Sequence, residues 1–223
     1  MDKIQETIKK IVEIEWEMFT SVNEGEPHAS CQDDRLTFEG MRAAQFREWS
    51  LHAAVEYLDD LQTARAAGRN LAEEKYIHMM KTTEPSRYSA LLSRVVMPTD
   101  SARALAQEIN AILIGQTRLL YESYPYVSGQ GRPLYSAFDY NGISVETYQF
   151  GELLTYSEKT LSALKEHVLA LEKSNISLAR RILESTVRFY GYDSLDSAES
   201  ATKERIDSEG IQISYGCGGV CDI

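Results

Sequence analysis

The sequence contains few residues that break helices or cross-link a chain, and it has no long apolar run. Only five prolines and three cysteines occur among its 223 residues. The odd number of cysteines, two of them in the last seven residues, argues against a disulfide-framed secreted domain. No run is apolar enough to cross a bilayer, and Met1–Phe19 alternates charged with apolar residues. We therefore expect a cytoplasmic protein without a targeting segment or a membrane span.

Basic residues are fewer than acidic ones, and the usual motifs of nucleotide and metal sites are missing. There are 23 Lys and Arg against 34 Asp and Glu, a formal net charge of -11. That charge repels phosphate backbones and anionic lipids, so we predict neither nucleic-acid nor membrane binding. The sequence has no GxGxxG, no GK[ST] loop, no GxSxG and no HExxH. No histidine follows a glutamate by three positions, as a di-iron bundle requires. We predict no metal site, and the cofactor is unknown.

Between the few breakers, apolar residues recur every three or four positions, the period of amphipathic helices. This pattern predicts an all-α fold, a single-domain antiparallel bundle of seven to eight helices over residues 1–208. A flexible tail rich in glycine and cysteine is expected over residues 209–223. The expected helices cover about 4–22, 34–68 with a bend near Ser50, 70–81, 84–97, 100–123, 144–174, 175–189 and 194–207.

Polar residues within the apolar stripes are the first candidates for a functional site. Glu15 lies between Ile11 and Met18 on one helical face, and Glu152 lies between Tyr148 and Tyr156. A buried carboxylate needs a basic, phenolic or metal partner. We expect one polar cavity formed by Glu15, Arg42, Gln45, Gln116, Glu152 and Tyr156. The alternative is that each residue is half exposed or paired locally.

These residues suggest roles in a small-molecule-binding protein or an enzyme. Glu15 and Glu152 would act as general acid and base or anchor a ligand, and Arg42 would hold an anionic group. By contrast, Glu74 and His78 are four positions apart, which favours an ordinary pair on a helix surface.

The segment HASCQDD at residues 28–34 places a thiol and two carboxylates just before a helix start. Cys31 with Asp33 would lie at the mouth of the site, because a helix N-terminus can activate a thiol. The simpler interpretation is that the acids cap the helix and Cys31 is a small buried residue. In the tail, Cys217 and Cys221 lie among glycines, which suits a swinging thiol arm, a sulfur relay or a modified peptide segment. The simpler interpretation is a terminal segment whose cysteines carry no role, since chain ends tolerate change.

Residues 124–144 form the longest connection without a helical pattern, and such loops often carry function. The tyrosines in and just before this connection, from Tyr121 to Tyr140, would make a contact surface if the protein were a helical interaction module or an accessory subunit. A protein partner is therefore the alternative to a small-molecule ligand.

Several separated blocks carry a resemblance to a known family. EIEWEMF, ASCQDD, TFEGMRAAQFREW, GRNLAEEKYIHMM and SVETYQFGELLTYSEKTL occur in this order between residues 13 and 161. They resemble the bacterial family catalogued as domain of unknown function 4125. The resemblance implies a helical domain in a bacterial cytoplasm and supplies no reaction. The cysteine-containing tail lies outside it.

Overall fold

The structure is a computed structural model that describes residues 2–22, 30–129 and 131–210, and all regular secondary structure in these ranges is helical. The all-α prediction is confirmed, but seven to eight helices is too low a number for the described residues. The α-helices are α1 (Lys3–Thr20), α2 (Arg35–Arg47), α3 (Leu51–Ala66), α4 (Leu71–Thr83), α5 (Pro85–Leu91), α6 (Asp100–Ser123), α7 (Pro125–Ser128), α8 (Val145–Leu153), α9 (Glu158–Lys173), α10 (Leu178–Phe189) and α11 (Leu195–Glu209). Short 3-10 helices form η1 (Ser30–Asp33), η2 (Leu92–Arg94) and η3 (Ser136–Asn141).

Two of the long predicted helices are each divided by a serine. Ser50 and Ser157 have extended backbones, and each side chain accepts a hydrogen bond from the backbone N–H three residues later. Such an N-cap starts a new helix and ends the preceding one. The apolar period continues through both serines, which is why the sequence predicted a bend at Ser50 and an unbroken helix over 144–174.

Several other helix starts follow the same chemistry. Asp34 caps α2, Asn70 caps α4 and Thr99 caps α6, and in each case the side chain accepts a hydrogen bond from a backbone N–H. Pro125 occupies the first turn of α7, where its missing N–H costs nothing. The expected irregular connection over 124–144 therefore contains the short helices α7 and η3.

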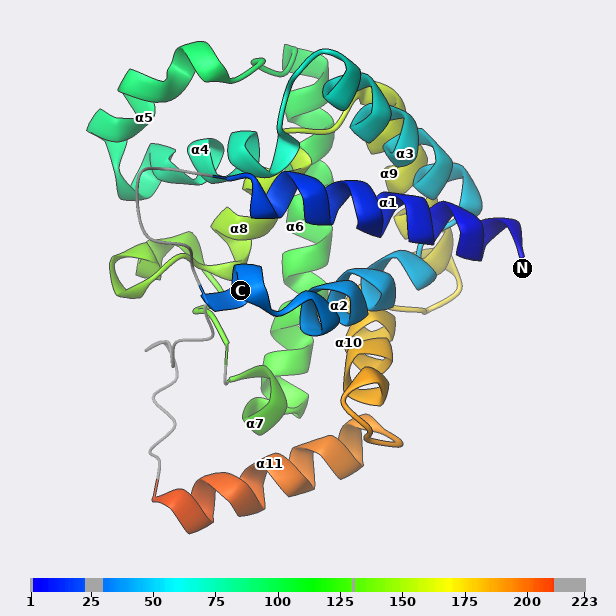
Figure 1. Ribbon diagram of the computed structural model, residues 1–223. Helices are drawn as coiled ribbons and strands as arrows, with labels where there is room; N and C mark the ends of the chain where they lie inside the picture. The colour runs from blue at the N-terminus through cyan, green and yellow to red at the C-terminus, as the bar shows by residue number, and fades with distance from the viewer. Residues whose placement is uncertain (1, 23–29, 130, 211–223) are drawn as a thin grey trace.

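The helices pack around α6, which runs through the middle of the molecule and contacts α7, α8, α9 and α10 (Figure 1). On one side α1 crosses the molecule and contacts α2, α3 and α4. α11 lies across the far end of α10 and contacts α7 and α10. The helices thus run in several directions, which departs from the simple antiparallel bundle that the sequence predicted.

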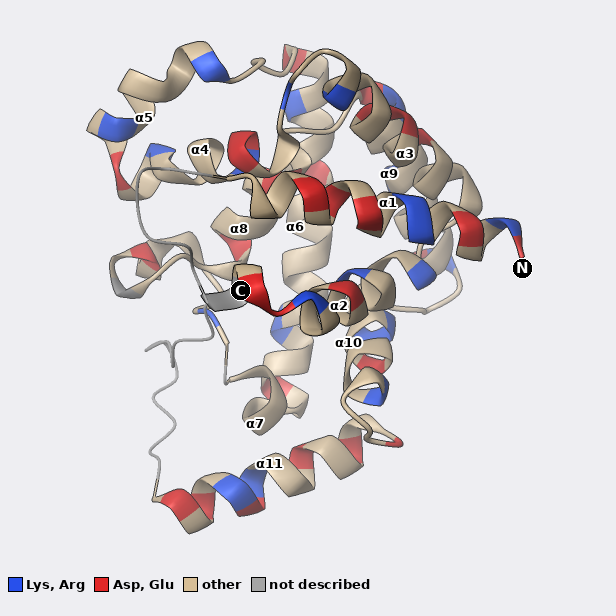
Figure 2. Cartoon of the chain, in the orientation of Figure 1, with Lys and Arg blue, Asp and Glu red and all other residues tan. Residues whose placement is uncertain are grey.

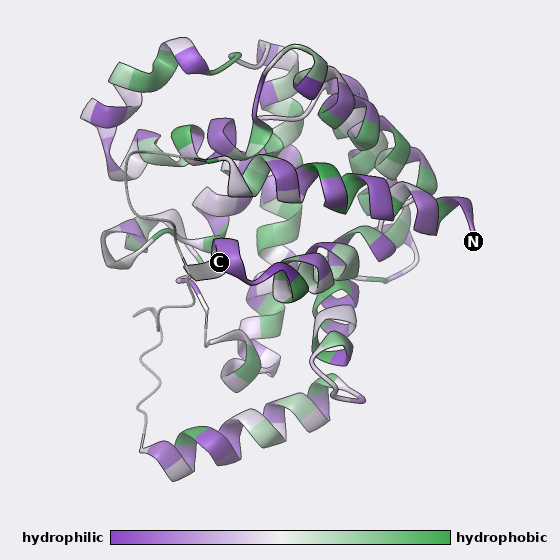
Figure 3. Cartoon of the chain, in the orientation of Figure 1, coloured by the Kyte–Doolittle hydropathy of each residue, from purple (hydrophilic) through white to green (hydrophobic). Residues whose placement is uncertain are grey.

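The main core is assembled from the inner faces of α1, α2, α3, α4, α6, α8, α9 and α10. Fully buried side chains include Ile11, Phe46, Leu61, Ile109 and Leu161. Figure 3 shows polar and apolar residues alternating along α1, and Figure 2 shows acidic and basic residues mixed along α1 and α11. α11 joins the rest through a small separate cluster built on Val187, Leu195 and Ala198. Within the described ranges, no helix is both long enough and apolar enough to span a bilayer.

A close approach between α4 and α8 depends on a glycine. A Cβ atom at Gly151 would lie 2.7 Å from Cγ of Met79 and 3.1 Å from the backbone oxygen of Lys75. Both distances are too short for an ordinary carbon contact. Gly151 therefore lets α8 lie directly against α4, and this contact brings Lys75 beside the inner end of α8.

We predict opposite effects for two helical glycine substitutions. Gly151→Ala should destabilise the fold by about 1–3 kcal/mol, because the added methyl group forces α4 and α8 apart. A Cβ atom at Gly115, inside α6, would meet no other atom within 4 Å. Gly115→Ala should stabilise by about 0.5–1 kcal/mol through helix propensity alone. Urea unfolding followed by circular dichroism measures both, and equal effects would contradict the close-packing argument.

Candidate functional site

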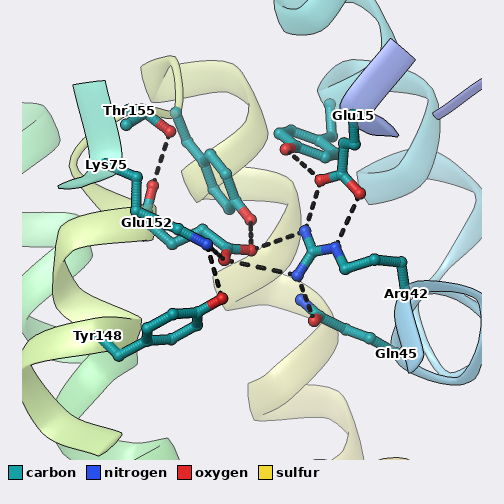
Figure 4. A network of polar contacts seen from close by, with 9 residues as sticks. Glu15, Arg42, Gln45, Lys75, Tyr148, Glu152 and Thr155 are labelled. Atoms are coloured by element: carbon teal, nitrogen blue, oxygen red, sulfur yellow. Dashed lines mark hydrogen bonds and ion pairs between the residues drawn. The ribbon is translucent and has the colours of Figure 1, made fainter. Parts of the chain in front are cut away.

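Five helices and one turn bring charged and phenolic side chains to a common point in the interior (Figure 4). We call Glu15, Arg42, Lys75 and Glu152 the charge cluster. They come from α1, α2, α4 and α8 respectively. Tyr57, Tyr148, Tyr156 and Gln45 bind directly to members of the charge cluster. Sequence-distant charges thus share one interior space, and Glu15, Arg42, Gln45, Glu152 and Tyr156 lie together as the predicted cavity required.

Arg42 occupies the centre of the charge cluster. Its Nε and Nη2 donate to the two carboxylate oxygens of Glu15 at 2.7 and 2.5 Å, a bidentate pair. Nη2 also donates to Oε1 of Glu152 at 2.9 Å, and Nη1 donates to Oε1 of Gln45 at 2.9 Å. The guanidinium therefore holds two carboxylates from opposite sides (Figure 4).

Lys75 is the second cation of the charge cluster, and three tyrosines bind to its members. Nζ of Lys75 donates to the hydroxyl of Tyr148 at 2.7 Å and to Oε2 of Glu152 at 3.3 Å. The hydroxyl of Tyr57 donates to Glu15 and that of Tyr156 donates to Glu152, each at 2.7 Å. Two carboxylates and two cations give a formal charge of zero. Ionised side chains are tolerated in an interior when they are balanced and hydrogen-bonded in this way.

Ion pairing outweighs burial in setting the ionisation states. Burial alone would raise the pKa of the Glu152 carboxyl, but Arg42 and then Lys75 hold that pKa well below its usual value. Burial would lower the pKa of Lys75, but Tyr148 and Glu152 raise it above its ordinary value. Burial and neighbouring carboxylates raise the pKa values of Tyr57 and Tyr156. At neutral pH Glu152 and Lys75 are charged, and both phenols are neutral.

Two cavities border the charge cluster. The small cavity, of about 60 Å³, lies among α1, α2, α3, α4 and α8 and is lined by Glu15, Arg42, Tyr57, Lys75 and Glu152 together with apolar side chains. The large cavity, of about 450 Å³, lies among α2, α6, α8, α9 and α10. Glu152 and Tyr148 line both. The large cavity falls in the size range of small-molecule sites, roughly 300–1,000 Å³.

The large cavity is mainly apolar. Its walls include Met41, Trp49, Leu113, Leu120, Val127, Leu153, Leu164, Leu178, Ile182 and Leu183. Polar groups enter it from α2 and α8, where Gln45, Tyr148 and Glu152 lie, and from Tyr156 just after α8. Arg132 also lines it, and its guanidinium donates to the backbone oxygen of Ile143 at 3.2 Å and lies over the ring of Tyr148. Ser128 of α7 also lines it, and its buried hydroxyl has no hydrogen-bond partner in the described structure.

Gln116 does not join the charge cluster, contrary to prediction. Its Oε1 accepts hydrogen bonds from the hydroxyl of Ser177 and the backbone N–H of Ala179, each at 3.1 Å. Gln116 therefore fixes the start of α10. Its position in an apolar stripe correctly indicated burial, but the polar partners it found belong to a helix terminus.

The other predicted positions have different outcomes. Asp33 lies in η1 and is exposed, and Asp34, not Asp33, caps α2. Cys31 belongs to the same short helix, but its side chain is outside what the structure describes. Cys217 and Cys221 also fall outside the described residues, so the roles given to these thiols stay predictions.

Lys75, Tyr57 and Tyr148 belong to the site but were not among the predicted site residues. A signal for Lys75 was present, since it lies four positions after Leu71 and four before Met79, both buried. Tyr57 lies likewise between Ala53 and Leu61. A lysine on such a stripe is as informative as a glutamate, because both must find a partner when buried. Among the described residues no group of three or more acidic, histidine or cysteine side chains is arranged to hold a metal ion.

The fold and the charge cluster define an all-helical protein with a buried, internally neutralised polar centre beside an apolar cavity. The chain belongs to the family described as protein of unknown function (DUF4125), which it matches over residues 5–200. The resemblance carried by the sequence blocks is thereby confirmed. Comparison with curated proteins and with solved structures gave no match.

We predict that Arg42 is essential to stability. Arg42→Met leaves Glu15 without its cation and Glu152 with only Lys75, so the variant should lose about 3–5 kcal/mol. Arg118, which pairs with Glu122 on the exposed side of α6, is the matched control. Arg118→Met should cost less than about 1 kcal/mol. Chemical unfolding of both variants measures the difference, and similar losses would show that the central arginine has no special weight.

We predict a distinct acid dependence from Glu152. Because its folded pKa is lowered, its contribution to stability is present above the unfolded pKa of about 4.3 and is lost as the pH falls below it. The stability advantage of the wild type over Glu152→Gln should therefore shrink between about pH 5 and pH 3, by at most about 1.4 kcal/mol per pH unit. A difference in the free energy of unfolding between the wild type and Glu152→Gln that stays constant over this pH range would contradict the ionised state of Glu152.

Proposed function

We propose that this protein binds a small, mainly apolar molecule carrying an oxygen that accepts hydrogen bonds, and that the large cavity is its site. The observation that carries the proposal is the meeting of a large apolar cavity with a polar wall of Gln45, Tyr148, Glu152 and Tyr156, which the charge cluster holds from behind. Specific small-molecule sites typically combine apolar walls with a few fixed polar groups.

The polar wall offers donors rather than free charge. Oε1 of Gln45 is occupied by Arg42, and its amide nitrogen has no hydrogen bond within the described structure. The hydroxyl of Tyr148 accepts a hydrogen bond from Lys75, which leaves its own hydrogen without a described acceptor. Both residues line the large cavity. A ketone, ether or hydroxyl oxygen of a ligand would satisfy these two donors.

The charge cluster serves this site by holding the donors in place. Arg42 fixes the orientation of the Gln45 amide, and Lys75 fixes that of the Tyr148 phenol. Rotamers locked by neighbouring hydrogen bonds reduce the entropy lost when a ligand binds. In this proposal Glu15 and Glu152 anchor the two cations. The lowered pKa of Glu152 favours this binding role over proton transfer near neutral pH, which requires a pKa close to the working pH.

The fluorescent naphthalene ketone Prodan is a suitable probe because it has an apolar body and one carbonyl oxygen. We expect saturable binding to the wild type. Leu113 of α6 lines the large cavity, so Leu113→Trp should weaken binding at least about tenfold by filling the space. Leu119 of the same helix is exposed and lines none of the cavities described, so Leu119→Trp should change affinity by less than about twofold.

The same titration tests the polar wall. The emission of Prodan moves to longer wavelength when its carbonyl accepts hydrogen bonds. Gln45→Leu should therefore shift the emission of bound Prodan to shorter wavelength while binding persists. Absence of saturable binding, or equal affinities of Leu113→Trp and Leu119→Trp, would overturn the proposed site.

A further inference from the structure

A separate cavity of about 360 Å³ lies on the opposite face of α8. We call it the His78 cavity. It is bounded mainly by α4, α6 and α8, and its lining includes His78, Lys81, Arg103 and Glu146. Along α8, Val145, Tyr148, Gln149 and Glu152 face the large cavity, whereas Glu146, Thr147, Phe150 and Gly151 face this one. The helical period of α8 thus divides two cavities whose linings share no residue.

His78 brings an unusual group to the lining of this cavity, a buried imidazole with an unpaired ring nitrogen. Only 6% of the residue is exposed, and Nε2 has no hydrogen-bond partner in the described structure. The expected surface pairing with Glu74 is wrong, because both residues are buried and Glu74 is bound by Arg69 through two hydrogen bonds of 2.8 and 2.7 Å. A buried, unsatisfied ring nitrogen is costly and calls for a hydrogen-bond partner.

Two cations line the same cavity. Lys81 comes from α4 and Arg103 from α6, and neither makes an ion pair with a carboxylate of the described residues. Burial, followed by the charges of Arg103 and Lys81, lowers the pKa of His78 to about 4. These two cations are therefore close enough to act on the imidazole, which is neutral at pH 7.

The acidic groups facing the cavity are already bound to neutral donors. Glu146 of α8 lines it and accepts a hydrogen bond from the backbone N–H of Ser136 at 2.7 Å. Asp139 of η3 lies just behind the lining and accepts hydrogen bonds from Thr82, Thr147 and the backbone of Ser144. Neither carboxylate neutralises Lys81 or Arg103 directly.

We propose that the His78 cavity is a second binding site, for a small phosphomonoester. The phosphate oxygens would lie between Lys81 and Arg103 and would also accept a hydrogen bond from Nε2 of His78. The apolar part of the ligand would lie against Phe150, Leu154 and Ala111, which line the same space. The site is independent of the large cavity and of the function proposed for it.

Occupation of the site has a specific electrostatic consequence. The two negative charges of a bound phosphate would offset the two cations that disfavour protonation of His78. The pKa of His78 should therefore rise on binding. By linkage, the ligand should bind more tightly to the form in which His78 is protonated.

The test uses the full-length protein labelled with ¹⁵N and follows the imidazole signals by NMR, with His78→Gln to assign them. Phenyl phosphate and inorganic phosphate are the probes. Phenyl phosphate should shift the His78 signal saturably and raise its pKa by at least about one unit. Inorganic phosphate, which lacks the apolar part, should bind at least about tenfold more weakly. Equal affinities would overturn the assignment to a phosphomonoester.

Matched lysine and arginine variants separate this site from general charge effects. Arg103→Met and Lys81→Met should each weaken phenyl phosphate binding at least about tenfold. Lys10→Met, which removes an exposed cation of α1 outside the cavity, should change it by less than about twofold. If Arg103→Met fails to fold by circular dichroism, Lys81→Met gives the same comparison, because Lys81 is exposed. A His78 signal that does not respond, or equal effects of Lys81→Met and Lys10→Met, would overturn the proposal.

Discussion

The structure depends on the need to compensate one guanidinium in the interior. The guanidinium of Arg42 is largely shielded from water. Burying a charge without partners costs more free energy than the packing of one helix against another supplies. Its two carboxylates come from positions 27 residues before it and 110 residues after it. Satisfying Arg42 therefore fixes α1, α2 and α8 relative to one another. Lys75 is then required on α4, because Glu152 would otherwise bring an uncompensated charge.

The same requirement bears on where the large cavity lies. Gln45 and Glu152 are held by Arg42 and do not fill the apolar space beside them. The large cavity lies in that space, between these polar groups of α2 and α8 and the apolar side chains of α6, α9 and α10. The turn between α8 and α9 also places a residue beside the charge cluster. α8 ends at Leu153 and Ser157 starts α9, so Tyr156 lies in the turn between them and donates from there to Glu152. An unbroken helix through this segment would carry the following residues straight past the charge cluster.

Much of the fold was predictable because helix chemistry is local. Spacing of apolar residues located the helices, and caps such as Asp34, Asn70 and Thr99 located several of their starts. Burial of Glu15 and Glu152 followed from the same spacing, and Arg42 was expected in the same cavity from its place beside a stripe. The local pattern does not identify which residue a buried polar side chain will bind. Gln116 and Glu152 both interrupt apolar stripes, yet Gln116 accepts hydrogen bonds from the start of α10 and Glu152 binds Arg42. The cavities were also unpredictable, since they depend on how side chains of several helices fill the space between them. The suggested protein contact at Tyr121–Tyr140 and the tail chemistry remain predictions.

The long sequence separation within the charge cluster has a consequence for the order in which the chain can fold during synthesis. When α1 to α4 have emerged from the ribosome, the interior they would enclose contains Glu15, Arg42 and Lys75, one positive charge in excess. The compensating carboxylate arrives only with α8, after roughly 70 further residues. A compact early intermediate of the first four helices is disfavoured by this imbalance. The nascent chain therefore closes its centre late, when the helix that supplies Glu152 docks.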